Sequence, residues 1–142
     1  MEDRRKISIL IPYKTRNGDV FVYLQKRSDN AKRLPGCFGF FGGGREGNEN
    51  PEEVLRREIQ EEMNFIPKNF THFKIYEFEK SIKDIFILEV DDTFEGGIKI
   101  LEGDYGKWFG KNEALNEPKL IEEDKVVLED FYKFLRFGEK IK

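Results

Sequence analysis

Cysteine, histidine and long apolar runs are scarce in this chain, and each scarcity excludes a class of protein. The 142 residues include one cysteine, Cys37, and one histidine, His72. A lone cysteine cannot form an intrachain disulfide, which fits a reducing compartment, and nothing in the sequence ties His72 to Cys37 as a catalytic base. No apolar run approaches the roughly 18–20 residues of a membrane span, and no signal-peptide pattern follows Met1. We therefore expect a cytoplasmic protein without a membrane partner.

A strong charge of one sign is also missing. The 25 Lys and Arg residues nearly balance the 28 Asp and Glu residues, which leaves a formal net charge of −3. This balance argues against a stable nucleic-acid partner, because such binding depends on neutralising phosphates with basic side chains. Phenylalanine, by contrast, is abundant with 14 copies, so aromatic side chains should supply much of the core. The length suits a single domain over residues 1–142.

The apolar pattern alternates between strands and helices along the chain. Asn17-Gly18 is a strong hairpin signal between two apolar segments, and polar residues at 81–84 are suited to a second turn. The expected strands cover residues 7–13, 20–25, 70–80, 84–91, 98–101 and 107–109, and the expected helices cover 51–63 and 122–137. This order predicts an α+β fold in which helices pack on a mixed sheet.

Both helices carry recognisable local signals. Asn50 is a good N-cap, Pro51 suits the first helical position, Glu53 completes a capping box, and Asn64 can end the helix in the left-handed conformation. In the second helix one apolar face predicts docking onto the sheet; it consists of Val127, Leu128, Phe131, Phe134 and Leu135.

Three glutamates of the first helix share one face, because Glu58, Glu61 and Glu62 are spaced i, i+3 and i+4. Carboxylates this close repel one another, and a hard divalent cation such as Mg²⁺ would offset the repulsion. A solvated acidic face is the competing interpretation, and on spacing alone it is the better one. The surroundings of the trio change that balance: glycines 42–44 directly precede the helix and allow close backbone approach to a ligand, and Arg57 lies within reach of Glu53 and Glu61.

The stretch from Gly43 to Phe65 resembles the Nudix box: Gly, five residues, Glu, seven residues, Arg-Glu, an aliphatic residue, one residue, Glu-Glu, one residue, Gly and an aliphatic residue. The corresponding positions here are Gly43, Glu49, Arg57, Glu58, Ile59, Glu61, Glu62, Asn64 and Phe65. Asn64 departs from the pattern, although Asn is the next-best residue for a positive φ. The resemblance implies the Nudix fold, an α/β/α sandwich.

The resemblance also implies roles for these residues. It implies one or more Mg²⁺ or Mn²⁺ ions as cofactor, bound by the residues Gly43 (through its carbonyl), Glu58, Glu61 and Glu62. Arg57 would orient Glu58, with help from Glu49. The general base would be a helix glutamate or a downstream carboxylate, for which Glu102 is the first choice because it precedes a Gly-Asp-Tyr-Gly segment expected to be mobile. The implied catalytic set is therefore Arg57, Glu58, Glu61 and Glu102.

The implied reaction is metal-dependent hydrolysis of a phosphoanhydride bond in a small nucleotide-type substrate. A nucleoside triphosphate, an oxidised nucleotide, a dinucleoside polyphosphate, ADP-ribose and a nucleotide sugar all fit. Basic residues that could receive the distal phosphate are Arg27, Lys32 and Arg33, and aromatic residues that could stack on a base are Tyr13, Phe40 and Tyr105. The sequence is compatible with a homodimer.

Two other functions compete with hydrolysis. A non-catalytic Nudix-fold module would bind a nucleotide as a regulator, but degenerate metal positions would be expected there, and the trio is intact. An isomerase of isoprenoid diphosphates would need a suitably placed cysteine and further metal ligands, which one cysteine and one histidine hardly supply.

Overall fold

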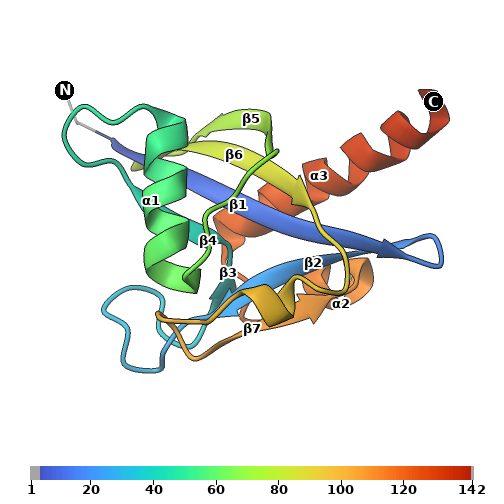
Figure 1. Cartoon of the computed structure of the whole chain (residues 1–142), viewed down its shortest axis with the longest axis horizontal. Helices are drawn as coiled ribbons and strands as arrows, with labels where there is room; N and C mark the ends of the chain where they lie inside the picture. The colour runs from blue at the N-terminus through green and yellow to red at the C-terminus, as the bar shows by residue number, and fades with distance from the viewer. Residues whose placement is uncertain (1–3, 142) are drawn as a thin grey trace.

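The computed structural model describes residues 4–141 as a sheet with helices on both faces (Figure 1). The strands are β1 (Arg5–Arg16), β2 (Asp19–Lys26), β3 (Phe38–Gly39), β4 (Phe41–Gly44), β5 (Thr71–Glu77), β6 (Ser81–Glu89) and β7 (Tyr105–Phe109). The helices are α1 (Pro51–Met63), the short α2 (Lys111–Leu115) and α3 (Glu122–Ile141), and a 3-10 turn, η1, covers Glu95–Gly97. No helix in this described part of the chain is long and apolar enough to cross a membrane.

The long strand β1 organises the seven-stranded sheet. Along one edge β1 pairs in parallel with β6, from Arg5↔Ser81 to Tyr13↔Glu89. Along the other edge it pairs antiparallel first with β4 and then with β2. The remaining pairings, β2 with β3 and β7 and β5 with β6, are antiparallel, so the sheet is mixed as predicted.

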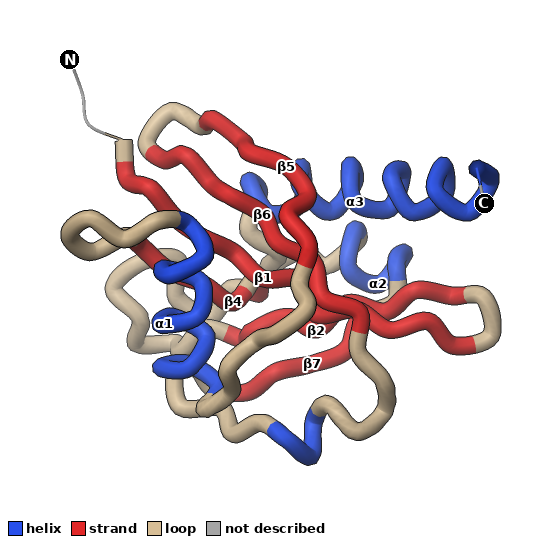
Figure 2. The backbone as a smooth tube through the Cα atoms, turned by 45° about the horizontal axis from the view of Figure 1, so that its top comes forward, coloured by secondary structure: helices blue, strands red, loops and turns tan. Residues whose placement is uncertain are grey.

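Helices α1 and α3 cover opposite faces of this sheet (Figure 2). Successive side chains of a strand point to opposite faces, so Ile9 and Ile11 join the core under α3 while Leu10 joins the core under α1. Aromatic rings fill much of both cores, as the phenylalanine content predicts. These contacts confirm the predicted α+β fold, with the sheet between two layers of helix.

Helix α1 forms over the predicted residues because its signals are local. The Asn50 side chain accepts a hydrogen bond from the Glu53 N–H, and the Glu53 side chain accepts one from the Asn50 N–H, which completes the capping box. Glu53, which the spacing placed within reach of Arg57, is therefore engaged at the cap instead. Asn64 ends the helix with φ 52°, the left-handed conformation that the departure from glycine was expected to preserve.

Two predicted elements are wrong for reasons that lie outside their own sequence. Residues 98–101 form no strand, because the N–H groups of Lys99 and Leu101 donate to the carbonyls of Met63 and Glu62, which the end of α1 leaves without helical partners. The turn predicted at 81–84 lies earlier, where the Phe78 N–H donates to the Ser81 carbonyl. Residues 81–84 instead begin β6.

Polar residues can begin β6 because each meets a partner from another element. The Lys83 ammonium contacts Asp124 at 3.3 Å and Glu123 at 3.0 Å on α3, and the His72 ring on β5 bonds the Asp84 carboxylate at 2.9 Å.

The C-terminal part of the chain differs from prediction in two further details. Helix α2 was not predicted, because five residues are too short to show a helical period. Of the predicted apolar face on α3, Val127, Leu128 and Phe131 are buried as expected, whereas Phe134 is 48% exposed. Phe134 still makes an edge contact with Phe73 of β5.

Candidate functional site

The glycine segment of β4 lies against the C-terminal half of α1. Gly42 has φ 148°, and its N–H donates to Glu62 Oε1 at 2.8 Å. A Cβ on Gly42 would overlap the Ser8 carbonyl, and one on Gly43 would overlap the Glu58 carboxylate. Only glycine therefore lets this backbone approach two of the helix glutamates so closely.

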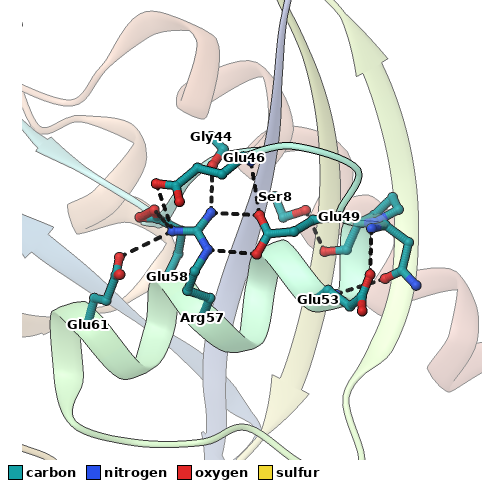
Figure 3. A network of polar contacts seen from close by, with 10 residues as sticks. Ser8, Gly44, Glu46, Glu49, Glu53, Arg57, Glu58 and Glu61 are labelled. Atoms are coloured by element: carbon teal, nitrogen blue, oxygen red, sulfur yellow. Dashed lines mark hydrogen bonds and ion pairs between the residues drawn. The ribbon is translucent and has the colours of Figure 1, made fainter.

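Arg57 ties the loop to the helix (Figure 3). Its Nε and Nη2 donate to the two oxygens of Glu49 at 2.7 and 2.8 Å, a bidentate pair, and Nη2 also donates to the Gly44 carbonyl at 2.9 Å. Its Nη1 donates to Glu58 at 2.9 Å and to Glu61 at 3.3 Å. The predicted contacts of Arg57 with Glu58, Glu49 and Glu61 are confirmed.

Glu62 is a buried carboxylate, only 6% exposed. Burial, together with the charges of Glu102 and Glu58, raises the pKa of Glu62 to about 9, although the Gly42 N–H opposes the shift. Burial also raises the pKa of Glu58; Arg57 opposes this shift, and the charges of Glu61 and Glu102 add to it. The local field therefore disfavours negative charge and would favour a cation.

Glu61 is the most exposed of the three glutamates, and its carboxylate shares the Arg57 Nη1 donor with Glu58 (Figure 3). Among the side chains that the structure describes, no three of His, Cys, Asp or Glu are already arranged to hold a metal ion. Arg57 donates to Glu61 Oε1 and the Gly42 N–H donates to Glu62 Oε1, so one oxygen of each carboxylate is already engaged.

The negative charge of Glu102 lies near enough to Glu58 and Glu62 to add to the raised pKa of both. The Leu101 N–H, directly before it, donates to the Glu62 carbonyl at 2.7 Å. The segment between β6 and β7, which contains no strand, thus lies beside the end of α1.

The other predicted binding residues divide into two groups. Arg27 lies close enough to Glu62 to lower its pKa, and its Nε donates to the Arg33 carbonyl at 2.9 Å, while the side chains of Lys32 and Arg33 are exposed. Among the aromatic candidates, Phe40 is 7% exposed and Tyr13 packs on Phe131 in the core under α3, whereas Tyr105 is 46% exposed.

Two residues that bear on the site were not predicted. Asp124 of α3 is buried, and its Oδ2 accepts a hydrogen bond from the Phe40 N–H at 3.1 Å, immediately before the glycine segment. Gln25 of β2 is buried beneath the Glu102 turn. A single polar residue in an otherwise apolar strand was the only signal for Gln25, and Asp124 looked like any other acidic residue of a helix start.

The Glu49–Arg57 pair makes part of the stability dependent on pH. Hydrogen bonds from Arg57 lower the pKa of Glu49 to about 2, from an ordinary value of 4.5. A carboxylate with a lowered folded-state pKa contributes stability above its unfolded pKa and loses that contribution as the pH falls toward the folded pKa. The Glu49→Gln variant should therefore unfold at lower urea concentration than the wild type at pH 7, and the difference should shrink between pH 4.5 and pH 2.

Urea unfolding at pH 7, 5 and 3 measures this difference directly. Glu79→Gln, in the exposed β5–β6 turn, reports the effect of losing one carboxylate from the net charge alone. A deficit of Glu49→Gln that is the same at pH 7 and pH 3 would refute the assignment of the pH dependence to this pair.

Comparison with known proteins agrees with this geometry. The family model described as NUDIX domain matches residues 3–131. The 8-oxo-dGTP diphosphatase of Escherichia coli (strain K12) is 30% identical over 94 residues, which cover 66% of this chain and 72% of that protein.

Solved structures show the same fold. The NUDIX domain of Shewanella oneidensis NrtR, complexed with ADP ribose, superposes with a TM-score of 0.76 at 15% identity, over 95% of this chain and 90% of that chain. A MutT structure from a study of the Aliivibrio salmonicida and Vibrio cholerae proteins gives a TM-score of 0.71 at 23% identity, over 90% and 96% of the two chains. With the family model spanning most of the sequence and the box residues gathered at one site, the chain belongs to the Nudix hydrolase family.

Proposed function

We propose that this protein hydrolyses a phosphoanhydride bond in a nucleotide-type substrate with the help of Mg²⁺ or Mn²⁺. One observation carries the proposal: the carboxylates of Glu58 and Glu62 lie against the backbone of Gly43 and Gly42, where burial and the nearby charge of Glu102 disfavour their negative charge. Carboxylate oxygens of this kind suit a hard divalent cation, which would offset both costs. The ligands would be the Gly43 carbonyl and the carboxylates of Glu58, Glu61 and Glu62.

The protein's own part in the reaction is positioning and electrostatics. A bound divalent cation would supply charge neutralisation at the phosphates and a water of lowered pKa. Arg57 holds Glu58 in one orientation and fixes the loop through Glu49 and Gly44. Glu102 is the proposed general base, since its charge acts on Glu58 and Glu62 from a separate segment that is hydrogen-bonded to the end of α1.

Substrate binding falls to the loop between β2 and β3. Arg27 is the basic residue nearest the acidic site, and the exposed Lys32 and Arg33 extend the positive charge outward for a distal phosphate. The exposed Tyr105 is the remaining aromatic candidate for stacking on a base, because Tyr13 and Phe40 are committed to packing. The two ligands named for the similar proteins, 8-oxo-dGTP and ADP ribose, both contain phosphoanhydride bonds and support this substrate class.

The competing functions find less support. A regulatory module needs no base opposite its glutamates, yet Glu102 lies there. For the isomerase, Cys37 lies half-buried with its thiol directed at the Pro35 carbonyl, and His72 is engaged with Asp84 on β5.

A substrate panel tests the proposal most broadly. Nucleoside triphosphates, 8-oxo-dGTP, ADP-ribose, a dinucleoside polyphosphate and a nucleotide sugar would be incubated with the protein and Mg²⁺, and the products identified by chromatography. We expect hydrolysis of at least one phosphoanhydride, loss of activity in excess chelator, and recovery with Mg²⁺ or Mn²⁺. Turnover that persists undiminished in metal-free buffer, or cleavage of simple monoesters alone, would contradict the proposal.

Replacing the glutamates with glutamine separates function from stability. Glu62→Gln removes a buried carboxylate whose pKa is raised to about 9, so without added metal it should stabilise the fold, by about 1–3 kcal/mol at pH 7. Glu61→Gln removes only a half-exposed ion pair and should change stability by less than about 1 kcal/mol. Turnover by either variant should fall ~10²-fold or more, as for loss of a metal ligand at the transition state.

Thermal melts with and without Mg²⁺ complete the comparison. Metal that binds the native state alone raises Tm by mass action, so Mg²⁺ should stabilise the wild type more than either variant. Gln60→Met, on an exposed position of the same helix, is the matched control. If Glu62→Gln melted well below the wild type yet kept full turnover, the glutamate would be structural and the metal-site assignment would be wrong.

A further inference from the structure

The turn that carries Glu102 is fixed at both ends by main-chain hydrogen bonds. On one side the Leu101 N–H donates to the Glu62 carbonyl at 2.7 Å, which joins the turn to the end of α1. On the other side the Asp104 N–H donates to the Lys26 carbonyl at 2.8 Å, and the Lys26 ammonium donates to the Asp104 carboxylate at 3.0 Å. The segment after Glu102 was expected to be mobile. These contacts instead attach the Glu102 turn to α1 on one side and to β2 on the other.

Between these two attachments, one buried side chain reaches Glu102 itself. Gln25 of β2 is 4% exposed, and its Nε2 donates to the Glu102 carbonyl at 3.1 Å across 77 positions of sequence. The next residue, Gly103, has φ 80°, and a Cβ there would lie 2.9 Å from the Lys26 carbonyl oxygen and 3.0 Å from Gln25 Cγ. Gln25 is thus both the donor to the turn and the surface on which the turn packs.

We propose that Gln25 is a positioning residue that fixes the backbone of Glu102 and so orients the Glu102 carboxylate, the proposed general base. This inference rests on the proposed function, and it names residues of that site which the Nudix box does not include. Without the amide donor, the Glu102 carbonyl would stay buried and unpaired or would rotate toward water, and rotation would carry the side chain with it. Misplacement of a reacting group by about 1 Å can cost on the order of 10²-fold in rate.

The strand itself does not need the Gln25 amide. The pairing of β2 with β3 and β7 runs through main-chain groups, with Gln25 in register with Gly39 and Gly106. A Gln25→Met substitution keeps the length of the side chain and these pairings, and removes only the donor to Glu102. Its effect should therefore appear at the turn.

A double-mutant cycle distinguishes positioning from general support of the fold. Gln25→Met, Glu102→Gln and the double variant would be compared with the wild type by kcat and KM, on the best substrate of the panel with saturating Mg²⁺. We expect kcat of Gln25→Met to fall ~10-fold or more while KM changes less than about threefold, and the double variant to match Glu102→Gln alone. Gln60→Met is the matched control and should keep wild-type kcat.

A second variant displaces the same turn without touching β2. Gly103→Ala places a methyl group against Lys26 and Gln25 at a positive φ, so it should also lower kcat, again without a further loss in the Glu102→Gln background. Gly96→Ala is its control, because a Cβ at Gly96 would meet nothing within 4 Å. If Gln25→Met fails to fold, Gly103→Ala still tests whether the position of the Glu102 turn affects kcat.

The outcomes separate this inference from the proposed function. Full kcat in Gln25→Met and Gly103→Ala, or losses that multiply with that of Glu102→Gln, would overturn the positioning role while hydrolysis stands. Full kcat in Glu102→Gln would overturn it as well, since there would be no base to position. A wild type that is folded and binds Mg²⁺ but hydrolyses nothing in the panel would overturn the proposed function and the positioning role together.

Discussion

The site depends on a single guanidinium. Arg57 binds Glu49, the Gly44 carbonyl, Glu58 and Glu61, so it joins the loop before α1 to the glutamate face of the helix. Contacts with Glu49 and Glu58 raise the pKa of Arg57 further above its ordinary value, so the charge persists at any pH the fold survives. A lysine could not replace it, because an ammonium group lacks the planar fork that binds Glu49 bidentately and still reaches Gly44.

The glycine segment beside Arg57 is held from both faces of the sheet. From α1, Glu62 accepts the Gly42 N–H; from α3, Asp124 accepts the Phe40 N–H and is itself paired with Lys83. Both acceptors are buried carboxylates whose pKa is raised by burial, so each costs desolvation free energy. The two helix layers thus add contacts to a short run of backbone that β1 already pairs with in the sheet and whose glycines have no side chains to pack.

Local signals made α1 predictable to the residue, because its cap, first turn and left-handed end are all encoded between Asn50 and Asn64. The contacts of Arg57 could be predicted from the Nudix box for the same reason, because the loop and the helix that it joins are adjacent in sequence. Residues 98–101 were mistaken for a strand because their partners are carbonyls of α1, more than thirty residues earlier. Gln25 and Asp124 were not predicted, because each bonds to backbone that is distant in sequence. The periodicity of apolar residues in a single sequence carries no information about such contacts.

Negative charge is energetically unfavourable at the proposed active site. The negative charges of Glu58, Glu62 and Glu102 disfavour one another, and burial disfavours that of Glu62, yet the fold holds Glu58 and Glu62 against glycine backbone. Such a concentration of disfavoured carboxylates is what a site for a cation and a polyphosphate requires. Stability is therefore expected to be lowest where the proposed function is located.

In the proposed reaction, solvent water attacks phosphorus at this site. Hydrolysis of the best nucleotide substrate in ¹⁸O-labelled water with Mg²⁺, followed by mass spectrometry of both products, tests it directly. We expect one labelled oxygen on a phosphoryl product. Label on a carbon-bound hydroxyl, or products without label, would contradict it.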